Sequence, residues 1–271
     1  MLSVIIPASN EAAYIGPCLT ALFASGPIGA EVIVVANGCK DDTAARARSM
    51  AAAAQEAGWT LIVLDLPVGG KPNALNAGDG AAYGSIRAYL DADVIVSPPL
   101  MAELIAALVP DTPLYATGTA RIPPARSAVT RAYARFWQAL PFARSNAPGY
   151  GLFATNAKGR ARWGQFPAII SDDTFVRLQF LPVERVQTPS LYFWPMIEGF
   201  AALTRVRRRQ DAGVAEINRL YPGLLDREAK VALTKTALLR LALQDPAGFA
   251  TYATISLTVR LRRGTGWTRG R

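Results

Sequence analysis

The chain has 271 residues, of which 51% are hydrophobic, and a formal net charge of +9. This hydrophobic content suffices for a full core and excludes a disordered chain. Histidine is absent and there are two cysteines, which excludes histidine triads, histidine metal ligands and a disulfide framework. Acid–base chemistry near neutral pH must therefore use carboxylates, Lys, Tyr or Cys, and a metal must take mainly oxygen ligands.

The first hundred residues alternate between strand-like and helix-like patterns. Short apolar runs predict buried strands at residues 3–6, 31–35, 60–64 and 86–90. The segments between them predict helices at residues 11–24, 41–57 and 71–82. Such alternation predicts a parallel sheet with helices on both faces, in which ligands bind beyond the carboxyl ends of the strands. Polar residues cluster at those ends, at 7–11, 37–38 and 91–93.

The later part of the chain is less regular and then becomes helical. Strands are predicted at residues 114–118 and 150–154, and helices at 127–140 and 172–180. From residue 197 onward the pattern predicts helices at 197–219, 227–243 and 246–262. No apolar stretch reaches the ~18 residues of a membrane span, and the N-terminus lacks the features of a signal peptide.

Asp91 and Asp93 follow the strand predicted at residues 86–90, with one residue between them. A strand that ends in two such carboxylates can hold a hard divalent cation, which in turn binds a diphosphate. The triplet is common by chance, and a capped loop is the alternative interpretation. The neighbouring motifs therefore decide its meaning.

Five segments follow one another in a recognisable order and spacing, at residues 4–11, 34–41, 70–78, 90–93 and 171–173. Together they resemble the family 2 glycosyltransferases of the GT-A fold, over about residues 2–210. The resemblance implies an α/β fold with a mostly parallel central sheet and helices on both faces. It implies a GT-A domain at 1–200, with a donor half at about 1–110 and an acceptor half at about 111–200, and a basic helical extension at 201–271.

The resemblance also implies a role for individual residues. The nucleotide sugar would be bound by residues of the first four segments and by the later arginine cluster: Pro7, Asn10, Glu11, Asn37, Lys71, Asn76, Asp91 and Arg208. Asn37 stands where the family commonly has a carboxylate that reads the base, so the base itself is left open. Asp93 and Asp91 would hold the metal, Mg²⁺ or Mn²⁺. Asp173 would be the general base, the alternative for the 172–173 pair being a helix N-terminus that complements the helix dipole.

The implied activity is transfer of one sugar from a nucleotide-diphosphate sugar to a hydroxyl acceptor, with inversion, by a hexosyltransferase-type enzyme. The acceptor is expected to be a lipid-linked or polysaccharide intermediate. The alternatives are a nucleotidyltransferase and a non-enzymatic basic protein that binds nucleic acid or membranes. The first would need a glycine-rich loop after the first strand, which residues 7–11 lack. The second should carry its basic charge on the sheet, so no nucleic-acid partner is expected.

Positive charge is concentrated in the last quarter of the chain. Residues 201–271 hold 14 basic and 5 acidic side chains, whereas residues 1–200 hold 15 of each. Five of these basic residues are arginines within residues 260–271, which also contain Trp267. This pattern predicts reversible binding to an anionic membrane surface, with a packed helical cap and a solvated tail as alternatives. The expected location is the cytoplasm, at the inner face of the membrane.

Overall fold

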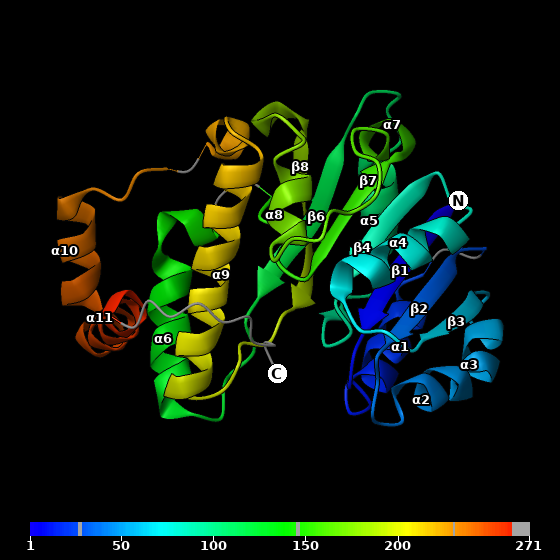
Figure 1. Cartoon of the computed structure of the whole chain (residues 1–271), viewed down its shortest axis with the longest axis horizontal. Helices are drawn as coiled ribbons and strands as arrows, with labels where there is room; N and C mark the ends of the chain where they lie inside the picture. Colours follow the sequence, from blue (N-terminus) through cyan, green and yellow to red (C-terminus); the bar gives the residue numbers. More distant parts are fainter. Residues whose placement is uncertain (27–28, 145–146, 230, 262–271) are drawn as a thin grey trace. The chain divides into compact units, whose positions relative to one another are not determined.

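The computed structural model describes residues 1–26, 29–144, 147–229 and 231–261 (Figure 1). The chain forms two compact units. The first comprises Met1–Arg121, Gly149–Ala168 and Asp172–Trp194. The second comprises Ile122–Pro148, Ile169–Ser171 and the chain from Pro195 onward. The division at residue 200 that the sequence suggests stays a prediction.

The first unit is built on one eight-stranded sheet of order β3-β2-β1-β4-β7-β6-β8-β5. Its strands are β1 (Leu2–Ala8), β2 (Glu31–Asn37), β3 (Thr60–Leu66), β4 (Ile86–Leu90), β5 (Ile95–Val96), β6 (Tyr115–Arg121), β7 (Leu152–Asn156) and β8 (Arg185–Phe193). The first four strands pair in parallel, as predicted. β7 runs antiparallel to both β4 and β6, and β5 runs antiparallel to β8. The predicted α/β fold with a mostly parallel sheet is therefore confirmed.

Helices cover this sheet in the order that the sequence predicts (Figure 1). They are α1 (Ile15–Ala24), α2 (Thr43–Ser49), α3 (Ala51–Glu56), α4 (Lys71–Ala81), α5 (Leu100–Ala107), α7 (Ala157–Arg160) and α8 (Asp172–Arg177). The single helix predicted at 41–57 is divided at Met50 into α2 and α3. β5, α5, α7 and β8 were not predicted.

Burial explains why the central strands form where they do. Every residue of β2 is buried, and so is every residue of β1 except Pro7. Strands covered on both faces need continuous apolar sequence, which these two runs supply. Their neighbour α4 packs on the same strands through Gly78, where an added Cβ atom would lie 2.5 Å from a methyl carbon of Ile5. The absence of a side chain thus permits the close approach of α4 to the sheet.

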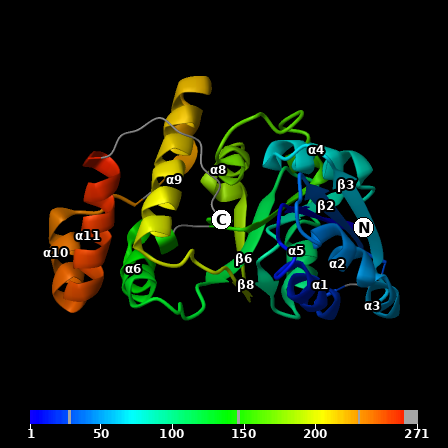
Figure 2. The same ribbon diagram turned by 60° about the horizontal axis from the view of Figure 1, so that its bottom comes forward.

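The second unit is helical. It contains α6 (Ala128–Ala139), α9 (Phe200–Leu220), α10 (Lys235–Gln244) and α11 (Pro246–Leu261), with short 3-10 turns at Pro141–Arg144 and Leu224–Glu228. α11 lies beside α6 in both views of the chain (Figures 1 and 2). Their contact is aromatic, because Phe136 of α6 packs against both Phe249 and Tyr252 of α11. Among the helices of the described chain, none has the length and apolar character that crossing a bilayer requires.

We predict opposite effects for two alanine substitutions in α4. Gly78→Ala should lower the free energy of unfolding by about 1–2 kcal/mol, since the cost of overpacking exceeds the gain in helix propensity. Gly80→Ala should raise it by up to ~1 kcal/mol, because an added Cβ there meets nothing within 4 Å. Urea unfolding of both variants tests this. Equal effects would show that the packing of α4 does not depend on Gly78.

Candidate functional site

The site lies where the parallel strands end. Asn37 is the last residue of β2, Asn10 and Glu11 follow β1, and Asp91 follows β4. These three strands are neighbours and run in parallel, so their carboxyl ends meet at one edge of the sheet. That edge is where α/β proteins bind their ligands. Pro7, Lys71, Asp91, Gly151 and Asp172 contribute to the lining of one cavity there.

Lys71 is the centre of the charged cluster. Its Nζ lies 2.9 Å from Oδ1 of Asp91 and 3.3 Å from Oδ2 of Asp172. Burial alone would lower the pKa of Lys71, but the negative charges of Asp172, Asp91 and Asp173 raise it above the usual value for lysine. Lys71 is therefore a fixed cation that joins the end of β4 to the beginning of α8.

Asp172 and Asp173 differ in exposure although they are adjacent. The side chain of Asp172 is 5% exposed, and burial raises its pKa to about 6 despite the opposing effect of Lys71. The side chain of Asp173 is partly exposed, and its Oδ1 accepts a hydrogen bond from the backbone N–H of Thr174 at 2.6 Å. The sequence motif contained both residues but gave a role only to Asp173. The contact between Asp172 and Lys71 spans 101 positions, and no local pattern indicates it.

Asp93 lies in the turn between β4 and β5 and is partly exposed. The thiol of Cys18 lies close enough to be affected by its charge. The pKa of Cys18 is raised far above the usual value, mainly by burial and further by the negative charges of Asp93 and Asp91. Cys18 is thus a buried neutral thiol. Negative charge is in excess at this edge of the sheet, because four carboxylates lie near the single positive charge of Lys71: Asp91, Asp93, Asp172 and Asp173. The edge therefore favours the binding of a cation.

The asparagines predicted to bind the donor make specific contacts in the first unit. The Nδ2 group of Asn37 donates to the carbonyl of Ala8 at 2.9 Å, and its Oδ1 accepts from the N–H of Gly70 at 2.9 Å. Asn37 thereby links the end of β1 to the residue that precedes α4. Oδ1 of Asn10, a residue with φ of 59°, accepts from the N–H of Lys40 at 2.7 Å.

The other predicted donor residues are distributed over both units. The backbone N–H of Glu11 donates to Oγ1 of Thr43 at 2.8 Å. Asn76 lies on α4, and its side-chain amide bonds to the backbone of Phe166. Arg208 lies on α9 in the second unit, so its proximity to the donor stays a prediction.

The comparisons with known proteins agree with this architecture. A model of glycosyl transferase family 2 matches residues 3–160. A search of curated proteins gave no significant match. The chain is similar to the mannosyltransferase PcManGT from Pyrobaculum calidifontis, solved with GDP-Man and Mn²⁺, at 19% identity and a TM-score of 0.64, covering 97% of this chain and 76% of that one.

Two further solved structures share the fold. TarS 1-349 from S. aureus in complex with UDP is 14% identical, with a TM-score of 0.55 and coverage of 96% of this chain and 91% of that one. Glucosyl-3-phosphoglycerate synthase from Mycobacterium tuberculosis, in complex with Mn²⁺, UDP and glucosyl-3-phosphoglycerate, is 22% identical. Its TM-score is 0.54, and the match covers 86% of this chain and 81% of that one.

The family match extends over more than half of the chain and includes the ends of β1, β2 and β4 and the start of α4. It argues against a nucleotidyltransferase and against a non-enzymatic binding protein. The chain belongs to glycosyl transferase family 2, and it is a GT-A glycosyltransferase that transfers a sugar from a nucleotide sugar.

Proposed function

We propose that this glycosyltransferase transfers its sugar with inversion to a hydroxyl acceptor, with Asp173 as the general base and with Mg²⁺ or Mn²⁺ as a cofactor. The observation that carries the proposal is the group of carboxylates at the carboxyl edge of the sheet: Asp91, Asp172 and Asp173 act on Lys71, and Asp93 follows Asp91 by two residues and acts with it on Cys18. Donor binding is assigned to about residues 1–110, acceptor contacts to about 111–200, and a basic helical extension to 201–271.

The residues of this edge fit a hard divalent cation that is shared with the substrate. Mg²⁺ usually keeps several waters and binds through one or two carboxylates together with substrate phosphates. Within the described residues, no group of three or more His, Cys, Asp or Glu is arranged to hold a metal by itself. We assign Asp93, which is partly exposed in the turn after β4, as the principal ligand and Asp91, which also pairs with Lys71, as the second. When bound, the cation would neutralise the diphosphate leaving group.

The ion pairs suggest how the protein's own groups divide the work. Lys71 holds Asp91 and Asp172 in place by ion pairs. All three residues line the cavity at the edge of the sheet, together with Pro7. Asn10, Glu11 and Asn37 shape the loops at the strand ends, where the nucleotide is expected. Arg208 is proposed to meet the leaving diphosphate, since arginine binds phosphate oxygens in a forked geometry.

Exposure favours Asp173 over its neighbour as the base. The buried carboxylate of Asp172 is occupied by Lys71. Asp173 is partly exposed, so an acceptor hydroxyl can reach it and transfer its proton. The acceptor oxygen that loses its proton to Asp173 would attack the anomeric carbon from the face opposite the diphosphate. The bond to the diphosphate breaks as the new bond forms, so the configuration inverts.

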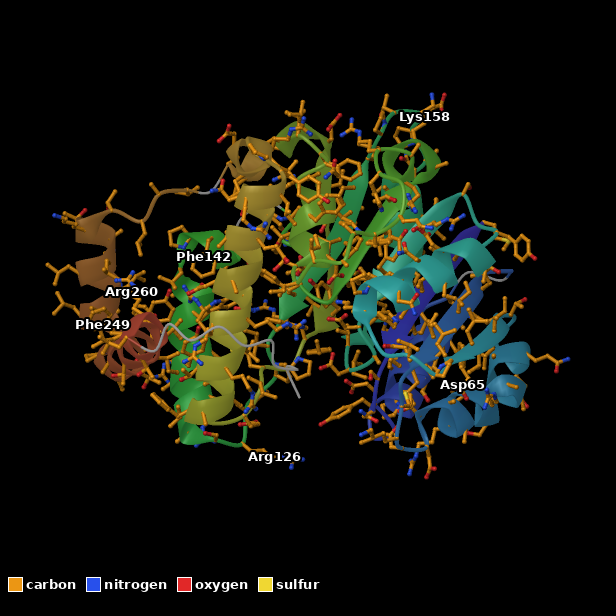
Figure 3. All side chains as sticks on the ribbon, in the orientation of Figure 1. Asp65, Arg126, Phe142, Lys158, Phe249 and Arg260 are labelled. Atoms are coloured by element: carbon orange, nitrogen blue, oxygen red, sulfur yellow. The ribbon has the colours of Figure 1, made fainter. Side chains whose placement is uncertain are left out.

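Asp93→Ala should abolish the Mn²⁺ dependence of nucleotide-diphosphate binding while the fold survives, because the principal metal ligand is lost. Calorimetry with GDP and UDP, each with and without Mn²⁺, measures this. Asp111→Ala is the control, since Asp111 is exposed and pairs with the surface residue Lys158 (Figure 3). Binding by Asp93→Ala that remains strong and dependent on Mn²⁺ would refute the metal assignment.

Asp173→Asn should lower the rate of sugar transfer by about 10²-fold or more while donor affinity stays near that of the wild type, since the amide cannot accept the proton. The measurement is steady-state turnover combined with the calorimetry above. Asp172→Asn serves as the adjacent comparison. If Asp173→Asn keeps the native rate and Asp172→Asn is inactive, the base is Asp172.

We further propose that the second unit binds an anionic membrane surface and that the acceptor is a lipid-linked or polysaccharide intermediate. α10 exposes Leu239 and Leu243, and α11 exposes Leu257 and Leu261. Each pair is four residues apart, hence on one face of its helix. Exposed basic residues accompany them on the same helices: Lys235, Arg240 and Arg260. Arg260 is labelled in Figure 3. The arginines and Trp267 of residues 262–271 lie outside the described residues.

Leu239→Ser combined with Leu243→Ser should weaken binding to vesicles that contain phosphatidylglycerol, because the apolar contribution is lost while the charges remain. Val109→Ser is the control, since Val109 is a similarly exposed apolar residue of the first unit. Sedimentation with phosphatidylcholine vesicles, with and without phosphatidylglycerol, should show binding only to the acidic ones, decreasing as salt rises. Equal binding to both vesicles, or to neither at low salt, would contradict the proposal.

A further inference from the structure

Asn76 makes two complementary hydrogen bonds with one backbone residue. Its Nδ2 group donates to the carbonyl of Phe166 at 3.1 Å, and its Oδ1 accepts from the N–H of Phe166 at 2.7 Å. Both ends of the side-chain amide are therefore used within the protein. We call this pair of bonds the Asn76 clasp.

The clasp holds a segment that has little regular structure of its own. Residues 161–171, between α7 and α8, form neither helix nor strand. Two bonds from Arg160 help to fix its first part: Nη1 donates to the carbonyl of Trp163 at 2.6 Å, and Nη2 donates to that of Gly164 at 2.9 Å. Arg160 is itself held by Asp79 of α4, whose Oδ2 accepts from its Nε at 2.6 Å.

Helix α4 thus contacts this segment and the two residues that flank it at three points. Asp79 fixes its beginning through Arg160, Asn76 fixes its middle at Phe166, and Lys71 pairs with Asp172 just beyond its end. A segment without internal hydrogen bonds of helix or sheet depends on such external contacts for its conformation. Helix α4, which begins with Lys71, therefore helps to determine the path of the chain that leads to Asp172 and Asp173. Glu216 of α9 also contributes, since its Oε2 accepts from the N–H of Ile170 at 2.8 Å.

We propose that Asn76 is a positioning residue, which acts through Phe166 to fix the residues that begin α8, and that it is not a ligand of the nucleotide sugar. The catalytic part of this inference rests on the proposed function of Asp173. A displacement of about 1 Å is enough to cost as much as 10²-fold in rate. Loss of the clasp should therefore reduce turnover far more than donor affinity.

The test uses Asn76→Ala in the full chain, with Asn156→Ala as a matched control. Asn156 is a second asparagine whose side chain binds backbone groups, namely the carbonyls of Pro110 and Thr112 and the N–H of Leu114. It is buried, whereas Asn76 is partly buried. Asn156 pairs with Ile86 at the end of β4 opposite to Asp91. Its Oδ1 also accepts from the N–H of Gly159 and so caps α7. Both variants should lose stability, and Asn156→Ala should loosen α7, but only Asn76→Ala should loosen the beginning of α8 and lower kcat.

Three measurements are made on each variant. Hydrogen exchange followed by mass spectrometry reports the protection of residues 161–177 in the free protein. Calorimetry with GDP or UDP and Mn²⁺ reports affinity, and release of GDP from GDP-mannose or of UDP from UDP-glucose reports turnover. For Asn76→Ala we expect faster exchange over residues 161–177, a fall of roughly tenfold or more in kcat, and nucleotide affinity within about twofold of the wild type. Asn76→Asp, which retains the bond to the Phe166 N–H, should be intermediate, and it serves if the alanine variant does not fold.

The outcomes separate this inference from the function on which it rests. Weakened nucleotide binding with unchanged exchange would make Asn76 a donor ligand and overturn the inference. Faster exchange with normal kcat would also overturn it, because the clasp would then not govern the carboxylates. If the wild type neither binds nucleotide nor turns over donor, the proposed function fails. Exchange over residues 172–177 then still decides whether the clasp positions the beginning of α8.

Discussion

The attraction between Lys71 and the carboxylates beside it is the interaction on which the site depends. A lysine at the first position of a helix is unfavourable on its own, because the helix N-terminus already carries partial positive charge. The partly buried ammonium is tolerated because Asp91 and Asp172 lie within 3.3 Å of it. Each of these residues belongs to a different part of the chain. The ion pairs therefore fix α4, the end of β4 and the start of α8 with respect to one another.

In the proposed function, a chain without histidine uses carboxylates of this cluster for its acid–base chemistry. Burial raises the pKa of Asp172 to about 6, while Asp173 next to it remains accessible. Neighbouring carboxylates in different environments can take different roles, one structural and one chemical. The excess negative charge at this edge suits a divalent cation and repels an unaccompanied diphosphate, so cation and donor are expected to bind together.

Much of the fold could be predicted from the sequence because β1 and β2 are buried on both faces and consist of continuous apolar runs. β8 escaped prediction because Pro189 interrupts it and its buried residues do not alternate regularly. Met50 divides the helix predicted at 41–57, although alanine-rich sequence surrounds it. Motif order predicted roles for Lys71, Asp91 and Asp173, and the structure brings the three side chains close enough for both carboxylates to act on Lys71. The pairing of Lys71 with Asp172 and the Asn76 clasp join residues about 100 positions apart, and no periodicity of the sequence encodes such contacts.

The order of strands in the sheet has a consequence for how the chain assembles during synthesis. β4 and β5 are separated by four residues, yet β5 lies at the outer edge of the sheet, paired with β8. β4 obtains its second neighbour only when β7, at Leu152–Asn156, has emerged from the ribosome. Until then it is an open edge of apolar sequence, and such edges invite pairing with other chains. While residues 91–151 are being synthesised, the nascent protein would therefore gain most from a chaperone that covers exposed strand edges and prevents aggregation.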